Sequence, residues 1–108
     1  MSFSGNDSAA KARLIKLSGP LNLHQAEKVS QSFKEIVAQG IERVVIDLQD
    51  VPFIDSRGLA ALIVGYKLFG RSGQNFRLAA LQGQPKLLLE LTGLDHIFQV
   101  VDSAEAFV

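Results

Sequence analysis

The segment RVVIDL, residues 43–48, most limits the folds that are open to this chain. It is short, rich in β-branched side chains and almost continuously apolar. Such a run is typical of a strand that is covered on both faces, as in a parallel sheet. Parallel strands need long crossover connections, which are usually helices. A strand of this kind therefore requires helical segments before and after it in the chain.

Helical spacing is present on both sides of that segment. Before it, apolar residues recur at helical intervals from Ala26 to Val37, and Gly40 stands where a helix would end. After it, a second helix is predicted, closed by a GRSG turn at 70–73, with an apolar side made of Leu59, Leu62, Ile63, Tyr66 and Phe69. A third helix is predicted to start near Pro85 and to end at Gly93, with an apolar face made of Leu87, Leu88 and Leu91.

Three more segments read as strands, at residues 13–19, 75–81 and 96–101, and a terminal helix is predicted to begin at 102. Strands that alternate with helices predict a single α/β domain with right-handed crossovers. We expect a central mixed or mostly parallel sheet of four to five strands with helices packed against it. Residues 1–10 are expected to form a flexible arm or a short first strand, and residues 11–108 the domain.

The amino-acid composition excludes several classes of function. The 108 residues fit one domain, and 47% are hydrophobic, which is enough for a core. Eleven basic residues balance eleven acidic ones and form no cluster, which argues against a nucleic-acid binder or a basic membrane patch. There is no cysteine, and the N-terminus lacks the pattern of a signal peptide. We expect a cytoplasmic protein with no membrane insertion, no metal and no cofactor.

The stretch FIDSRGLAALI, residues 53–63, carries the strongest functional signal. It joins the buried strand to the second helix, and such loops at the carboxyl ends of strands are where ligands and partners usually bind. Asp55 and Ser56 are both good N-cap residues, so a capping role alone could explain them. Gly58 would lie in the first helical turn, although glycine costs about 0.5–1 kcal/mol relative to alanine inside a helix. A bare backbone there would let a second protein approach the Ser56 hydroxyl.

Two segments in this order resemble the STAS family, which includes anti-sigma factor antagonists and cytosolic domains of sulphate transporters. They are VVIDLQDVPFIDSRGLAALIVGYK at 44–67 and LLLELTGLDHIFQVVDSAEAF at 87–107. The Asp-Ser-x-Gly-Leu joint and the Leu-Thr-Gly-Leu helix end carry the resemblance, which runs from about residue 11 to 107. In antagonists of this family the serine after the aspartate is the phosphorylation site, and Ser56 holds that place here.

The resemblance implies a small regulator in a partner-switching circuit. The unmodified protein would bind an anti-sigma factor that is also a serine kinase of the ATP-binding, histidine-kinase-like type, and this binding would free the sigma factor. Phosphorylation of Ser56 would release the antagonist, and a metal-dependent serine phosphatase would restore it. The implied partner-binding residues are Asp55, Ser56, Arg57, Gly58, Asn22 and His24.

The chain departs from the family pattern in two places. The loop that usually reads Gly-Glu-Leu-Asp is here Gly-Pro-Leu-Asn at 19–22, so Asn22 keeps an acceptor oxygen but lacks the charge. The residue after Ser56 is often small and hydroxylated, but here it is Arg57. The change at Asn22 would affect partner choice or the phosphorylation rate, and Arg57 would be a specificity contact or a partial neutraliser of phosphoserine. If they contact no partner, Arg57 and His24 are expected to be ordinary solvated side chains.

Two other functions are compatible with parts of the sequence. The chain could be a STAS scaffold that is never phosphorylated, for example a regulatory subunit bound to a transporter. A hydrolase could be imagined from Ser56, Asp55 and one histidine, but the chain has no Gly-x-Ser-x-Gly elbow. An aspartate next to the serine is also not the orienting acid of a catalytic triad. We therefore expect no enzymatic activity.

Overall fold

The computed structural model describes residues 12–69 and 75–103. Its four strands form one sheet in the order β1 (Ala12–Ser18), β2 (Arg43–Asp50), β3 (Phe76–Ala79) and β4 (Gln99–Val101). Every neighbouring pair of these strands is parallel. The predicted α/β domain with a four- to five-stranded, mostly parallel sheet is thus confirmed.

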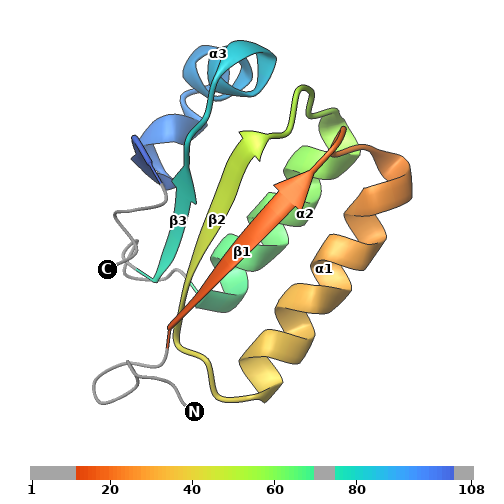
Figure 1. The fold of residues 1–108 in the computed structure, drawn as a ribbon, viewed down its shortest axis with the longest axis vertical. Helices are drawn as coiled ribbons and strands as arrows, with labels where there is room; N and C mark the ends of the chain where they lie inside the picture. Colours follow the sequence, from red (N-terminus) through yellow and green to blue (C-terminus); the bar gives the residue numbers. More distant parts are fainter. Residues whose placement is uncertain (1–11, 70–74, 104–108) are drawn as a thin grey trace.

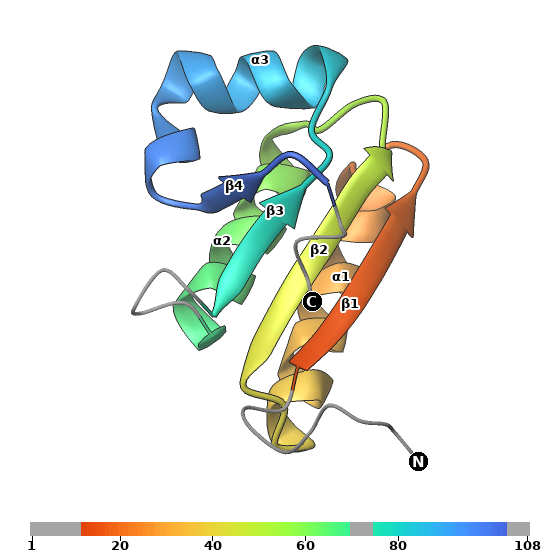
Figure 2. The same ribbon diagram turned by 60° about the vertical axis from the view of Figure 1, so that its left-hand side comes forward.

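The helices are α1 (Leu23–Ala38), α2 (Ser56–Phe69) and α3 (Gly83–Thr92), and a 3-10 turn, η2 (Leu94–His96), follows α3. Figure 1 shows α1 and α2 side by side on one face of the sheet. The turned view in Figure 2 shows α3 beyond the end of the sheet, above the carboxyl ends of the strands. Between residues 12 and 103, none of the described helices has the length and apolar character needed to cross a bilayer.

The core lies between the sheet and the two long helices. Phe33 of α1 meets Phe76 of β3 edge to face, with ring centroids 5.5 Å apart, and both side chains are fully buried. Gly65 of α2 lies against these rings, because a Cβ atom there would be 2.5 Å from Phe76 Cε1 and 2.7 Å from Phe33 Cε2. The absence of a side chain at Gly65 thus lets α2 pack closely on the aromatic centre.

The predicted third strand was too long at its carboxyl end. Residues 75–81 were expected to be extended, but β3 ends at Ala79. Ala80 adopts the left-handed region, with φ at 62°, which breaks the strand.

The prediction for residues 96–101 was half wrong. Only Gln99–Val101 form a strand, because η2 occupies Leu94–His96. Gly93 ends α3 in the left-handed region with φ at 76°, and the chain then makes a further tight turn that buries Phe98.

The predicted apolar face of α3 was also wrong in part. Leu89 is fully buried and Pro85 is buried, whereas Leu87 is exposed and Leu91 is 77% exposed. Leu88, from the predicted face, is partly buried and packs against the core, so α3 contacts the rest of the molecule through the side that holds Pro85, Leu88 and Leu89. The expected arm at 1–10, the turn at 70–73 and most of the expected terminal helix lie outside the described residues.

Candidate functional site

Two loops at the carboxyl ends of β1 and β2 lie side by side. An isolated parallel bridge joins Leu21 to Ile54. The Leu21 N–H donates to the Phe53 carbonyl oxygen at 2.8 Å, and the Asp55 N–H donates to the Leu21 carbonyl oxygen at 3.2 Å. The fold therefore connects the loop that leads to Asn22 with the loop that leads to Ser56, although these residues are far apart in sequence.

Asp55 is the residue that caps α2. Its Oδ1 accepts a hydrogen bond from the Gly58 N–H at 2.8 Å, and its carbonyl oxygen accepts one from the Leu59 N–H at 2.9 Å. A side-chain oxygen that accepts from the first turn is the usual N-cap interaction. Ser56, the first residue of α2, is therefore not needed as a cap.

The Ser56 side chain is exposed. Its hydroxyl makes no hydrogen bond to any other residue that the structure describes. A hydroxyl in this position is open to a second molecule, and it lies in the helical turn whose backbone N–H groups favour an anion. Arg57, the next residue, is exposed as well.

Gly58 has a packing role that the sequence did not reveal. It is buried, and a Cβ atom there would overlap the Leu21 carbonyl oxygen and lie 2.9 Å from Leu21 Cγ. Glycine thus lets the first turn of α2 lie against the loop after β1, which differs from the docking role that we expected. A direct contact of Gly58 with a partner stays a prediction.

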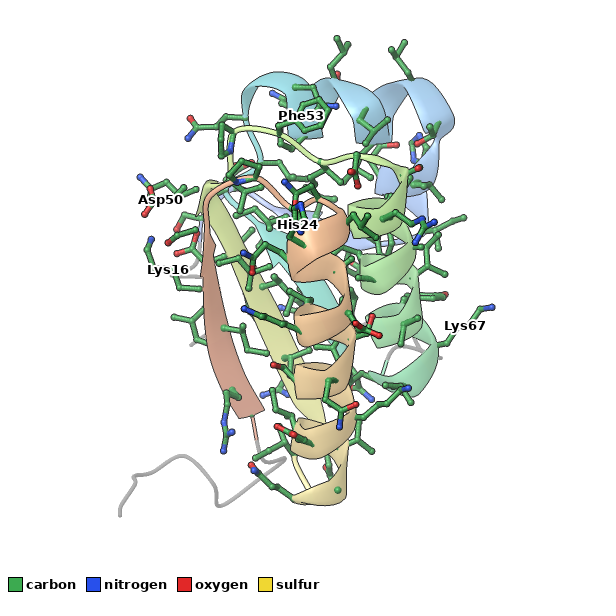
Figure 3. All side chains as sticks on the ribbon, turned by 90° about the vertical axis from the view of Figure 1, so that its right-hand side faces the viewer. Lys16, His24, Asp50, Phe53 and Lys67 are labelled. Atoms are coloured by element: carbon green, nitrogen blue, oxygen red, sulfur yellow. The ribbon has the colours of Figure 1, made fainter. Side chains whose placement is uncertain are left out.

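Asn22 caps α1 in the same way that Asp55 caps α2. Its Oδ1 accepts from the His24 N–H at 3.0 Å, and its carbonyl oxygen accepts from the Ala26 N–H at 2.8 Å. The capping function thus needs only an acceptor oxygen, which asparagine retains. His24 is exposed in the first turn of α1, and Figure 3 shows it at the same end of the molecule as Phe53.

Sequence reasoning missed two residues around this site. Phe53 was assigned no role, but its side chain is 45% exposed in the loop between β2 and α2. Gln84 of α3 binds both backbone polar groups of Ile54: its Oε1 accepts from the Ile54 N–H at 2.9 Å and its Nε2 donates to the Ile54 carbonyl oxygen at 3.0 Å. No local pattern marks Gln84, since its partner is thirty residues away in the chain.

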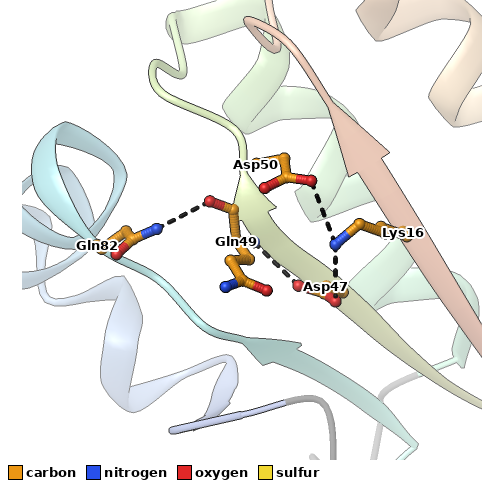
Figure 4. Close-up of polar contacts among 5 residues, drawn as sticks. All are labelled: Lys16, Asp47, Gln49, Asp50 and Gln82. Carbon is orange, nitrogen blue, oxygen red and sulfur yellow. Dashed lines mark hydrogen bonds and ion pairs between the residues drawn. The ribbon is translucent and has the colours of Figure 1, made fainter.

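Charged side chains gather where β1 and β2 end (Figure 4). Lys16 Nζ lies 3.3 Å from Asp50 Oδ2 and 3.5 Å from Asp47 Oδ2. The Asp47 side chain is only 10% exposed, and its Oδ1 accepts from the Gln49 N–H at 2.9 Å. The hydrogen bond to Asp50, together with the charge of both carboxylates, raises the pKa of Lys16 above its ordinary value. This cluster ties together the two strands that carry the site loops.

The chain is similar to known proteins over nearly its whole length. The STAS domain matches residues 5–106. The anti-sigma F factor antagonist of Paenibacillus polymyxa is 28% identical over 91 residues, which cover 83% of this chain and 78% of that protein.

Solved structures agree with this match. The crystal structure of an anti-sigma factor antagonist from Mycobacterium paratuberculosis has a TM-score of 0.76 at 28% identity, and the match covers 86% of this chain and 79% of that one. A sulfate transporter family protein from Wolinella succinogenes shares the fold, with a TM-score of 0.74 at 15% identity and coverage of 94% and 87%. The chain therefore belongs to the STAS domain family.

Proposed function

We propose that this protein is a non-catalytic anti-sigma factor antagonist in the cytoplasm, controlled by phosphorylation of Ser56. In this circuit the unmodified protein binds an anti-sigma factor that is also a serine kinase of the histidine-kinase-like ATPase type. The observation that carries the proposal is the exposed Ser56 hydroxyl in the first turn of α2, which Asp55 caps. The names of the similar proteins support the same role.

The switch would act through local charge. A phosphoserine carries about −1.5 to −2 charge at pH 7. In the first turn of α2 this charge is favourable for the isolated domain, because the free N–H groups and the helix dipole stabilise an anion. At a close-packed interface the same dianion must lose its water beside the Asp55 carboxylate. A mispaired buried charge of this kind costs about 2–5 kcal/mol, roughly a thirtyfold to several-thousandfold loss of affinity.

The other expected contacts belong to the two loops that the backbone joins, or follow Ser56 directly. Asn22 and His24 belong to the segment that the Leu21–Ile54 bridge holds beside the Ser56 loop, and Arg57 is exposed next to Ser56. We assign to these residues the choice of kinase, and to a metal-dependent serine phosphatase the reversal of the modification. Release by phosphorylation would then need no change of fold.

The first test is incubation with candidate kinases and Mg-ATP, followed by mass spectrometry. We expect one phosphate on Ser56 and none on the Ser56→Ala variant. Ser32→Ala is the matched control, since Ser32 is also an exposed helical serine but lies in α1. Phosphate on Ser32, or on no residue with any kinase that binds the protein, contradicts the proposal and favours an unmodified STAS scaffold.

The second test compares two substitutions of similar size. Ser56→Asp should remain folded by circular dichroism but lose roughly thirtyfold or more of its affinity for the kinase, because it adds a charge to the interface. Ser56→Asn adds nearly the same volume without the charge and should bind much closer to wild type. Equal losses for the two variants, measured by calorimetry, would show that size and not charge controls binding.

A further inference from the structure

Residues 53–55, which lead into Ser56, are held from two sides. On one side, the Leu21 backbone pairs with the Phe53 carbonyl and the Asp55 N–H. On the other side, the Ile54 N–H and carbonyl both pair with the side-chain amide of Gln84, at 2.9 Å and 3.0 Å. Consecutive residues of an extended chain direct their backbone polar groups to opposite sides. The Gln84 amide thus takes the place that a neighbouring strand would occupy.

A primary amide suits this place because it carries a donor and an acceptor on one rigid group. A carboxylate could accept from the Ile54 N–H but could not donate to the Ile54 carbonyl. A leucine could do neither. Ile54 is 1% exposed, so without Gln84 its backbone groups would be left unpaired in a buried position.

Gln84 is itself held firmly. The next residue, Pro85, is buried, and its ring restricts the backbone at the start of α3. Two residues earlier, Gln82 Nε2 donates to the Gln49 carbonyl oxygen at 2.8 Å and ties the same end of α3 to β2 (Figure 4). Figure 1 shows α3 beside the loop that connects β2 to α2. The start of α3 is therefore attached to both ends of that loop.

We propose that Gln84 is a positioning residue for the Ser56 hydroxyl. By holding the Ile54 peptide it fixes the direction in which the chain enters Asp55, the cap of α2, and so fixes Ser56 one residue later. This inference rests on the proposed phosphorylation of Ser56. Transfer of a phosphoryl group requires near-attack geometry, and a displacement of about 1 Å can slow such a step roughly a hundredfold.

The experiment compares Gln84→Leu and Gln84→Glu with wild type. In the isolated protein, amide hydrogen exchange at Ile54 should speed up roughly tenfold in Gln84→Leu, since one such bond corresponds to about that factor. Gln84→Glu keeps the acceptor and should show an intermediate rate. With the kinase, kcat for Ser56 should fall about tenfold or more in Gln84→Leu. KM should change much less than kcat, because the Gln84 side chain is partly buried and its amide is bound to the Ile54 backbone.

Gln82→Leu is the matched control. It removes an exposed glutamine bond from the same end of α3, but that bond reaches Gln49 and not the segment before Ser56. Exchange at Ile54 and kcat should therefore change much less in this variant than in Gln84→Leu, because both Gln84–Ile54 bonds and the buried Pro85 still hold Gln84. If Gln84→Leu does not fold, Gln84→Glu alone decides the question by the same two measurements.

The outcomes separate the two proposals. Wild-type exchange at Ile54 and wild-type kcat in a folded Gln84 variant would overturn the positioning role. A wild-type protein that no kinase modifies would overturn the phosphorylation proposal and with it the influence of Gln84 on phosphoryl transfer. The exchange measurement would then still establish whether Gln84 holds the loop.

Discussion

Because Gly58 has no side chain, the first turn of α2 can pack against Leu21 in the loop after β1. The first turn of α2 approaches the loop after β1 so closely that any Cβ atom at position 58 would overlap the Leu21 carbonyl oxygen. That oxygen also accepts the Asp55 N–H, so a shift of Leu21 would disturb the residue that caps α2. Glycine is thus needed here for packing within the protein. Its close contact with Leu21 helps to position Ser56 through the backbone hydrogen bonds of Leu21 and Asp55.

The Gly58→Ala variant should consequently be less stable. The helix itself would gain from alanine, but the clash with backbone atoms outweighs that gain, and overpacking of this kind costs about 1–3 kcal/mol. Urea unfolding measures the change. Ala60→Leu is the control, because Ala60 is exposed in the same helix and its substitution should stay within about 0.5 kcal/mol. A fully stable Gly58→Ala that fails to bind the kinase would instead favour direct docking at Gly58.

Among the elements, α3 differs most from its expected packing. Its sequence holds leucines at 87, 88, 89 and 91, so several stripes could have served as the buried face. The helix lies beyond the end of the sheet and has the core on one narrow side only. Leu89 falls on that side, while Leu91 points to solvent. Periodicity predicted the helix correctly but could not select among adjacent leucines.

Two leucines of α3 should therefore respond very differently to truncation. Leu89→Ala removes a fully buried side chain and should lower the free energy of unfolding by about 2–5 kcal/mol. Leu91→Ala, two residues away, removes a side chain that is 77% exposed and should change it by at most about 0.5 kcal/mol. Thermal or urea unfolding of the pair measures the contrast. A larger loss in Leu91→Ala than in Leu89→Ala would mean that α3 packs through the face that the sequence predicted.

The ion cluster of Lys16 links β1 to β2 and leads to a prediction about the pH dependence of stability. Since the pKa of Lys16 is raised, the folded protein holds this proton more tightly than the unfolded chain does. Its stabilising contribution is complete below the ordinary lysine pKa of 10.5 and is lost as pH rises through the higher folded value. Unfolding measured from roughly pH 9 upward should show a steeper loss in wild type than in Lys16→Met.

Lys67→Met is the control for that measurement, because Figure 3 shows Lys67 directed away from the protein at the end of α2. Its alkaline profile should match wild type. Added salt should weaken the effect of Lys16, whose side chain is about half exposed. Identical profiles for wild type and Lys16→Met would contradict a structural role for the cluster.

At the level of the whole molecule, the sequence predicted the order of strands and helices and the parallel sheet. Buried parallel strands need continuous apolar runs and crossover helices need a 3.6-residue period, and RVVIDL and the segments around it carry both signals. The Asp-Ser pair at the start of α2 could be predicted from local sequence too, since a helix must be capped at its start. The sequence could not predict which of Asp55 and Ser56 is the cap, because both residue types can cap.

Contacts between segments that are distant in the chain could not be predicted from local sequence patterns. The amide of Gln84 on the Ile54 backbone, the Leu21 oxygen against Gly58 and the lysine between Asp47 and Asp50 each join residues that no short pattern relates. Local propensities act over a few neighbours, so they specify which elements form. The side chains that hold the Ser56 loop in place are selected only when the packed elements bring their partners within hydrogen-bonding distance.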